Sequence, residues 1–161
     1  MTLTTYNEEL CKKLEPNVCT TKERFDVLAR LRDAGIPTVV WLCLILPFIN
    51  DTEENVAGSL NYCIEAKVRR IICFGVGMTL RQGNREYFYS RLDELFPGIK
   101  EKYIRLYGTQ YILNSPNSPS LTDLFQRTCT RHGITYDSKK IFEYLNTFAD
   151  KRTAKQLGLF G

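Results

Sequence analysis

A continuous apolar run between Gly35 and Asp51, with the sequence GIPTVVWLCLILPFIND, constrains the fold of this chain more than any other feature. The glycine and proline at its start are typical of the end of a helix. A short segment that is apolar on both faces is typical of a strand in a parallel sheet covered by helices. Ligands bind such sheets at the carboxyl ends of the strands. The loop at residues 47–51 is therefore the first candidate region for function.

The bulk composition indicates one globular domain. The 161 residues can bury a sizeable core, with 43% hydrophobic and 25% charged residues. The net charge of +4 is short of the strong positive bias of a dedicated nucleic-acid binder. The first ten residues lack the apolar segment of a signal peptide, and the longest apolar run is too short for a membrane span. We therefore expect a soluble, cytoplasmic protein with no membrane partner.

The six cysteines form no close pair in the sequence. They are expected to be reduced thiols, most of them small buried hydrophobes, because a chain of this size does not need a disulfide framework. Cys11 and Cys19 flank a short loop and are expected to be exposed. With one histidine and no paired cysteines, the chain is not expected to hold a zinc ion by itself.

The first half of the chain predicts strands that alternate with helices. The strands are expected at residues 1–5, 38–46 and 70–75, and a short helix is expected before Pro16. A helix from Thr20 begins with a capping box that pairs Thr20 with Glu23. The next helix, at residues 52–66, is expected to be capped by Asp51. This order predicts two right-handed βαβ units.

The second half predicts mainly helices. Residues 76–83 are expected to form a loop, and residues 114–120 a connector rich in Asn, Ser and Pro. Helices are expected at residues 84–96, 99–107, 121–132 and 138–156, followed by a loosely packed end at 157–161. Three parallel strands leave edges that natural proteins usually avoid, which suggests a piece of a larger barrel or sheet.

Several short motifs resemble, in their order and spacing, the second half of the radical S-adenosylmethionine (SAM) enzymes related to spore photoproduct lyase. The motifs are Thr2–Thr5, Leu14–Pro16, Arg24, Ala34–Pro37, Pro47 with Asn50–Asp51, and then stretches within residues 77–89 and 96–98. The resemblance implies an α/β fold: a fragment of a partial (β/α)6 TIM-type barrel, with three parallel strands and covering helices, plus a C-terminal helical extension. It implies a single domain, with a half-barrel at residues 1–83 and a helical part at 84–161.

The resemblance also implies an activity for a longer parent protein. Enzymes of this family cleave SAM with a [4Fe-4S] cluster held by a CxxxCxxC motif, which this chain lacks. It follows that the N-terminal, cluster-binding half is missing and would be the partner of this chain. Alone, the chain is expected to bind neither SAM nor a cluster and to be inactive. The implied chemistry is lyase-like, in DNA repair, with a nucleic-acid substrate. Open sheet edges would also allow a homodimer.

Site residues follow from the resemblance position by position, and no catalytic residue or metal ligand is assigned within the chain. The positions on the SAM side are Thr2, Thr4, Cys43, Asn50, Gly75 and Gly77. Threonine hydroxyls can hydrogen-bond the ribose or the amino acid moiety, and glycine permits close backbone contact. Leu44 stands where the family usually has proline. The positions on the substrate side are Arg81, Arg85 and Tyr87, which combine charge with stacking surface.

Simpler interpretations stay open for these residues. The threonines can be ordinary strand residues, Cys43 can be core, and the glycines can serve turns. Asn50 can cap a helix, and the tyrosines near residue 88 can flank the buried face of a helix formed by Phe88, Leu92 and Leu95. Glu15 and Arg24 can contact SAM or form an ion pair that fixes the first loop.

Two other functions compete with the radical SAM hypothesis. The first is a non-catalytic α/β module that binds a nucleotide or a nucleic acid, which the mildly basic charge permits. The second is a small phosphate-binding α/β enzyme of another kind, which no Ser-His-Asp set or P-loop in the sequence supports.

Overall fold

The computed structural model describes residues 1–147. The first six elements are β1 (Thr2–Leu3), α1 (Glu8–Leu14), α2 (Thr21–Asp33), β2 (Val39–Leu42), α3 (Glu53–Glu65) and β3 (Arg70–Ile72). The next six are β4 (Gly77–Thr79), α4 (Asn84–Leu95), α5 (Ile99–Tyr107), β5 (Ile112–Asn114), α6 (Ser118–Arg131) and α7 (Ser138–Leu145). The predictions for residues 148–156 and 157–161 lie outside the described residues.

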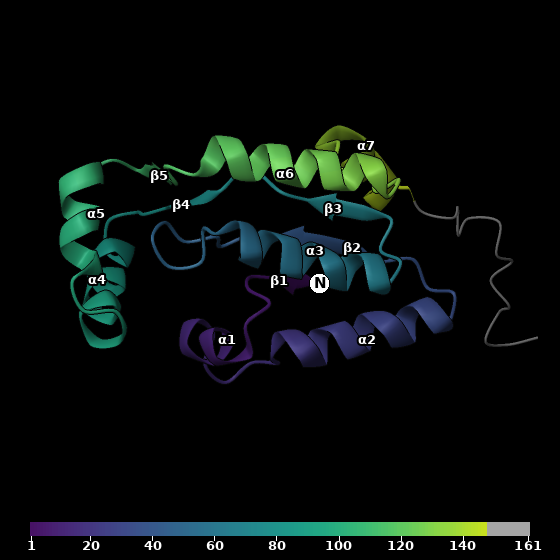
Figure 1. Ribbon diagram of the computed structural model, residues 1–161, viewed down its shortest axis with the longest axis horizontal. Helices are drawn as coiled ribbons and strands as arrows, with labels where there is room; N and C mark the ends of the chain where they lie inside the picture. The colour runs from purple at the N-terminus through teal and green to yellow at the C-terminus, as the bar shows by residue number, and fades with distance from the viewer. Residues whose placement is uncertain (148–161) are drawn as a thin grey trace, which may run out of the picture.

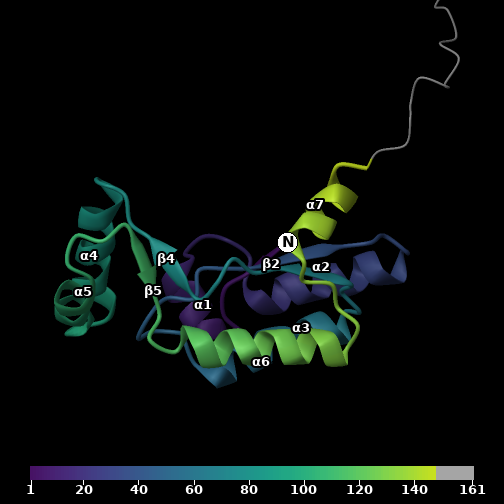
Figure 2. The ribbon, with the colours of Figure 1, turned by 90° about the horizontal axis from the view of Figure 1, so that it is seen from above.

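The centre of the fold is a parallel sheet in which β1, β2 and β3 are neighbours in sequence order (Figure 1). Thr2 lies opposite Trp41, and Val40 opposite Ile71. Helices α3 and α6 pack side by side on one face of the sheet, and α7 lies on the other side (Figure 2). The prediction of an α/β fold with a small parallel sheet is confirmed.

One core joins the sheet to its covering helices. Leu3, Val40 and Ile71 from the three strands are fully buried. They belong to a cluster that also contains side chains of α2, α3 and α6, among them Leu28, Leu60 and Phe125. Apolar residues of the predicted buried strands thus contact helices that follow them in the chain. Because α6 covers the sheet in the same way as α3, it completes the βα unit that begins with β3.

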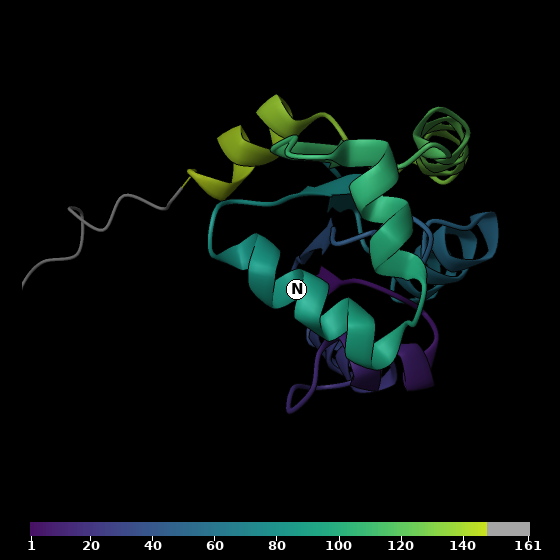
Figure 3. The ribbon, with the colours of Figure 1, turned by 90° about the vertical axis from the view of Figure 1, so that its left-hand side faces the viewer.

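The segment between β3 and α6 forms a second small unit at the carboxyl end of the sheet. β4 and β5 pair antiparallel, with Met78 opposite Leu113, and lead to the helices α4 and α5. Figure 3, viewed toward this end, shows these teal and green helices in front of the parallel sheet. They share their own core, which includes Leu92, Tyr103 and Tyr107.

This second unit corrects the predicted organisation. Residues 76–83 and 114–120 were expected to be loop and connector, but they contain β4 and the start of α6, and β5 ends at Asn114. The predicted boundary between the half-barrel and the helical part, at residue 83, falls inside this unit. β4 lies before the boundary and pairs with β5, which lies after it. The predicted helical extension is therefore an insertion in the third βα unit, followed by α6 and α7. Pairing between β4 and β5 is a long-range contact that local patterns do not encode.

Two local predictions differ from the structure and one agrees. The strand expected at residues 38–46 ends at Leu42, because Leu44 adopts a left-handed conformation with φ of 60°. The cap of α3 is Thr52, whose side chain accepts a hydrogen bond from the Asn55 N–H at 3.1 Å, and not Asp51. The capping box of Thr20 and Glu23 at the start of α2 is confirmed.

The cysteines are free thiols in the described chain. Cys19 is exposed as expected, whereas Cys11 is buried, because α1 turns it toward the interior. Cys63 is buried in the main core, where burial raises the pKa of its thiol to about 12. Among residues 1–147, no helix is both long enough and apolar enough to cross a membrane.

Candidate functional site

A cavity of about 200 Å³ lies at the carboxyl ends of the parallel strands. It is open to solvent on one side, and it is lined by the residue that follows β1, the end of α1, the loop after β2, Met78 of β4 and one face of α4. Its lining residues include Thr4, Lys13, Glu15, Leu44, Tyr87 and Arg91. Ile49, from the candidate loop at residues 47–51, also lines this cavity. The cavity therefore lies at the edge of the sheet that the buried-strand pattern indicated.

Thr4 brings an unusual polar group to this cavity. Its side chain is 1% exposed, and its hydroxyl has no hydrogen-bond partner among the described residues. Its carbonyl oxygen, by contrast, accepts hydrogen bonds from the side-chain amides of Asn50 at 3.0 Å and Asn55 at 3.4 Å. Buried hydroxyls without a partner are rare in folded proteins. The Thr4 hydroxyl is thus a buried polar group that no side chain or backbone group of residues 1–147 pairs.

Asn50 holds two of the surrounding loops together. It is 1% exposed, and its amide nitrogen donates to the carbonyl oxygens of Thr4 and, at 3.3 Å, of Leu44. Its amide oxygen accepts a hydrogen bond from the Leu46 N–H. Asn50 was predicted to contact SAM or to cap a helix. The structure instead places all of its polar atoms in bonds between the end of β1 and the loop after β2.

Leu44 has an unusual backbone conformation in the loop after β2. It is a non-glycine residue with φ of 60°, 47% exposed, in the wall of the cavity. A proline has φ near –65° and cannot adopt this conformation. The backbone here therefore follows a path that a protein with proline at this position does not share.

The ion pair of Glu15 and Arg24 fixes the loop after β1. The Arg24 guanidinium lies 2.9 Å from the Glu15 carboxylate, and both side chains are largely buried. The same guanidinium donates to the carbonyl oxygen of Thr2 at 3.3 Å. Of the two open interpretations, the geometry favours the one in which the pair positions the first loop.

A second hydrogen-bond network, which no sequence pattern indicated, joins the loop after β2 to the residues that follow β5. The Ser115 hydroxyl donates to the Asp51 carboxylate and accepts from the Asn117 N–H at 2.9 Å. The Asn117 amide donates to the Asp51 carbonyl oxygen at 3.0 Å. Asp51 lies 64 positions before Ser115 and 66 before Asn117, so no local pattern indicates these contacts.

The other residues predicted on the SAM side do not gather at the cavity. Thr2 and Cys43 are half-buried, and burial raises the pKa of the Cys43 thiol. Gly75 is exposed, with open space where a Cβ would lie. A Cβ at Gly77 would collide with the carbonyl oxygen of Leu113. The close approach that glycine permits at residue 77 is therefore to β5.

The residues predicted on the substrate side have different environments. Arg85 donates to the carbonyl oxygen of Gly108 at 3.1 Å and to that of Gln110, so it links α4 to the chain after α5. Arg81 is exposed, with its Nε 3.5 Å from the Tyr111 hydroxyl. Tyr87 is 70% exposed and lines the cavity. Arg91 lies there too, and its place four residues after Tyr87 on the predicted helix could have indicated it.

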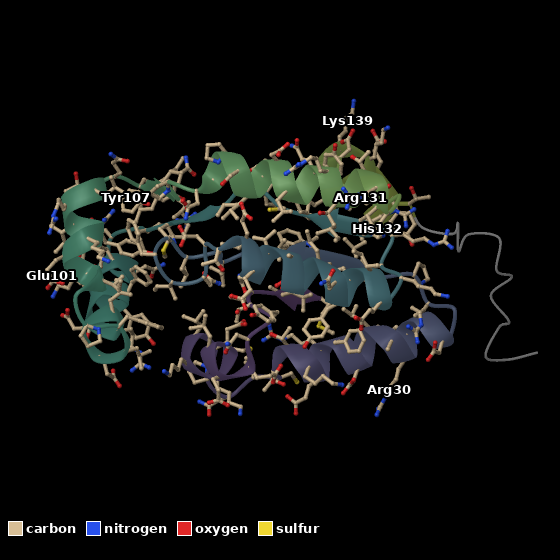
Figure 4. The ribbon with its side chains drawn as sticks, in the orientation of Figure 1. Arg30, Glu101, Tyr107, Arg131, His132 and Lys139 are labelled. Atoms are coloured by element: carbon tan, nitrogen blue, oxygen red, sulfur yellow. The ribbon has the colours of Figure 1, made fainter. Side chains whose placement is uncertain are left out.

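A basic groove of about 610 Å³ lies at the opposite, amino end of the sheet. Its cationic side chains are those of Arg32, Lys67, Arg69 and Arg70. The Arg70 guanidinium lies 3.5 Å from the centre of the Tyr144 ring. Figure 4 shows Arg30, Arg131, His132 and Lys139 at the same end of the molecule, far from Glu101 and Tyr107 on α5.

The donor groups of residues 1–147 do not fit an iron–sulfur cluster. Within that range, no group of three or more His, Cys, Asp or Glu side chains is close enough together to hold a metal. Comparison with protein-family models, curated proteins and solved structures gives no match.

Proposed function

We propose that this chain is the C-terminal part of a radical SAM enzyme, acting in nucleic-acid repair only together with the N-terminal half of the same protein. The observation that carries the proposal is the sequential order of β1, β2 and β3, all parallel, with α2, α3 and α6 packed against the same core. A segment of a partial (β/α)6 barrel repeats β and α units in this way. The resemblance in sequence assigns these units to the fourth, fifth and sixth positions.

The side of the sheet that α7 covers only in part supports the need for a partner half. Trp41 and Phe74 are 37% and 66% exposed, and their ring centres are 5.6 Å apart. Phe142 of α7 packs against both rings and leaves them partly exposed. A cluster of exposed aromatic side chains is typical of a surface that another protein segment covers.

In this proposal the chain supplies binding surface, and the cluster belongs to the partner half. Thr2, Cys43 and Gly75 would face SAM from the half-buried and exposed positions described above, and Tyr87 would face the substrate. Bound SAM would provide the radical chemistry. The side chains of this chain would position the reactants and exclude water from them.

The longer reading frame that contains this sequence tests the proposal. A CxxxCxxC motif is expected roughly a hundred residues before Met1, the length of three βα units. The longer protein, reconstituted without oxygen in the presence of iron and sulfide, should absorb broadly near about 400 nm, as cysteine-ligated clusters do. The 161-residue chain treated in the same way is the control and should not absorb there. A longer protein without the motif, or a cluster on the control, would overturn the proposal.

A second candidate, a non-catalytic module that binds nucleotides or nucleic acid, is favoured by the basic groove at the amino end. Cationic side chains beside an aromatic ring suit phosphates and stacked bases. A labelled single-stranded oligonucleotide should then bind with an affinity that falls steeply with salt. Arg69→Gln should weaken binding, whereas Lys102→Gln, on α5 at the other end, should not. Equal effects of the two variants would reject this candidate.

A further inference from the structure

The basic groove at the amino end of the sheet adjoins a second hollow that has an aromatic wall. This second hollow has a volume of about 430 Å³, and Val39, Trp41 and Leu145 are among its walls. Pro37 and Tyr144 line both hollows. Because the two hollows share these walls, the cations of the groove and the indole of Trp41 belong to one continuous surface.

The pairing of β2 with β3 explains why cations and aromatic rings lie together here. Val40 and Ile71 lie opposite each other and are fully buried in the core shared with α3 and α6. Side chains alternate between the two faces of a sheet, so the flanking residues Arg70 and Trp41 lie on the opposite face, toward α7. Both contact aromatic rings of α7. One face of the sheet thus carries both a guanidinium and an indole.

The cations of the groove are available to a polyanion. Lys67 and Arg69 are exposed and Arg70 is half-buried, and none of the three forms an ion pair with a carboxylate among residues 1–147. The Asp33 carboxylate also lines the groove, but it is paired with Arg32 at 2.8 Å. The groove therefore keeps a surplus of positive charge, which successive phosphate groups would neutralise.

The rings on the same face of the sheet suit the bases of an unpaired strand. Phe74 is 66% exposed, its ring meets that of Trp41 edge to face, and the Phe142 ring lies nearly parallel to it, at 15°. Exposed aromatic rings stack on nucleic-acid bases whatever their sequence, and an unpaired strand can turn the faces of its bases outward. Phosphate-binding cations beside such rings therefore favour a single strand over a duplex.

From this arrangement we infer that the amino end of the sheet binds single-stranded nucleic acid, with phosphates on Lys67, Arg69 and Arg70 and bases on Trp41 and Phe74. The inference rests on the second candidate function above and extends its site from the groove to the aromatic face of the sheet. The first proposal gives that face to a partner half, so the two proposals assign it different occupants.

Four competitors separate the contribution of charge from that of stacking. A labelled oligothymidylate of about 12 nucleotides, within the usual size of such sites, is bound to the 161-residue chain and followed by fluorescence anisotropy. It is displaced by the same strand unlabelled, by an abasic strand of equal length, by the matching duplex and by inorganic polyphosphate of equal charge. We expect the unlabelled strand to compete at least about tenfold more strongly than the other three, because only its bases are free to stack. Equal competition by any of the three would overturn the inference.

Matched variants assign the stacking and the phosphate contacts to residues. Phe74→Leu removes an exposed ring and should weaken binding of the oligothymidylate by about fivefold or more, whereas Phe74→Tyr keeps a ring and should bind as before. Tyr111→Leu, at an exposed position on the insertion, is the control and should change nothing. Arg69→Gln should lower the slope of log affinity against log salt by about 0.7, the value for one phosphate of a single strand. Phe74→Leu should leave that slope unchanged.

The outcomes distinguish this inference from the function on which it rests. A loss of binding in Phe74→Leu that Phe74→Tyr does not share supports the aromatic contact. If Arg69→Gln weakens binding and Phe74→Leu does not, the groove binds nucleic acid without the aromatic face, so the inference is wrong and the second candidate function stands. If the 161-residue chain binds no oligothymidylate, both are wrong. The cluster test on the longer protein is independent of these results.

Discussion

At the scale of single residues, two adjacent buried threonines differ in one hydrogen bond. The side chains of Thr4 and Thr5 are 1% and 0% exposed. The Thr5 hydroxyl accepts a hydrogen bond from the Asn7 N–H at 3.2 Å, whereas the Thr4 hydroxyl has no partner among the described residues. Both threonines follow the same two-residue strand, so only their surroundings separate a structural residue from a candidate binding residue.

This difference predicts opposite effects of the same substitution on stability. Thr4→Val should raise the free energy of unfolding by up to about 1 kcal/mol, because it removes an unpaired buried hydroxyl. Thr5→Val, the matched control, should lower it by about 1 kcal/mol, because it removes a bond that is made. Urea denaturation of the ligand-free chain measures both. A loss of stability in Thr4→Val similar to that in Thr5→Val would show that its hydroxyl is paired.

Substitution of Asn50 is expected to change the free energy of unfolding more than substitution of either threonine. Asn50→Leu should lower the free energy of unfolding by roughly 2–4 kcal/mol, because it leaves the buried Leu46 N–H and Thr4 carbonyl without this partner. Asn61→Leu, at an exposed position on α3, should change it by less than about 0.5 kcal/mol. The comparison is made by urea denaturation, and a difference within error between the two variants would contradict the assigned role.

At the scale of elements, the conformation of Leu44 decides where β2 ends. Leu44→Asn should be tolerated, because asparagine adopts the left-handed conformation readily. Leu44→Pro should destabilise the fold by about 3 kcal/mol or more, because the pyrrolidine ring excludes φ of 60°. The midpoints of thermal unfolding, followed by circular dichroism, distinguish the two variants. A stable Leu44→Pro variant would mean that this residue does not hold the left-handed conformation in the folded chain.

The insertion between β3 and α6 is attached to the loop after β2 at specific points. The buried Tyr103 hydroxyl donates to the carbonyl oxygen of Pro47 at 2.8 Å, and its ring contacts Phe48 edge to face. The hydroxyl of Tyr107 donates to the carbonyl oxygen of Asn114 at 2.7 Å, which links α5 to β5. These contacts bring α4 over the loops, so the cavity exists only when the insertion is in place.

At the scale of the whole molecule, buried thiols make stability depend on alkaline pH. Burial raises the pKa of Cys63 from 9.0 to about 12. Below about pH 9 the thiol is protonated in both states and stability is unaffected. Between pH 9 and 12 the unfolded chain loses this proton and the folded chain keeps it, so the free energy of unfolding falls as pH rises.

Cys63→Ala should therefore flatten this decline by about 1.4 kcal/mol per pH unit, the value for one proton. Its stability at neutral pH can be lower, because a buried sulfur is removed, but the slope is the measured quantity. Cys19→Ala, at an exposed position, should keep the original slope. Urea denaturation between pH 8 and 11 gives both slopes, and an unchanged slope in Cys63→Ala would contradict a buried, protonated thiol.

The sequence predicted the βα organisation of the main sheet because its signals are local. Apolar runs indicated β2 and β3, and the capping box at Thr20 indicated the start of α2. Helices α4 and α5 began at the predicted residues, Asn84 and Ile99. The same signals failed for β4 and β5, because neither lies in a continuous apolar run like those of β2 and β3, and each is stabilised by pairing with the other.

By itself, the sequence determined the class of fold and the edge of the sheet where a site should lie, because buried strands and helix caps leave patterns within a few residues. Only the tertiary structure decided which side chains meet there. It placed Arg85 and Asn50 in structural hydrogen bonds, and it left the Thr4 hydroxyl unpaired beside α4. Whether a polar side chain is paired depends on atoms that are distant in the sequence, and only packing brings those atoms together.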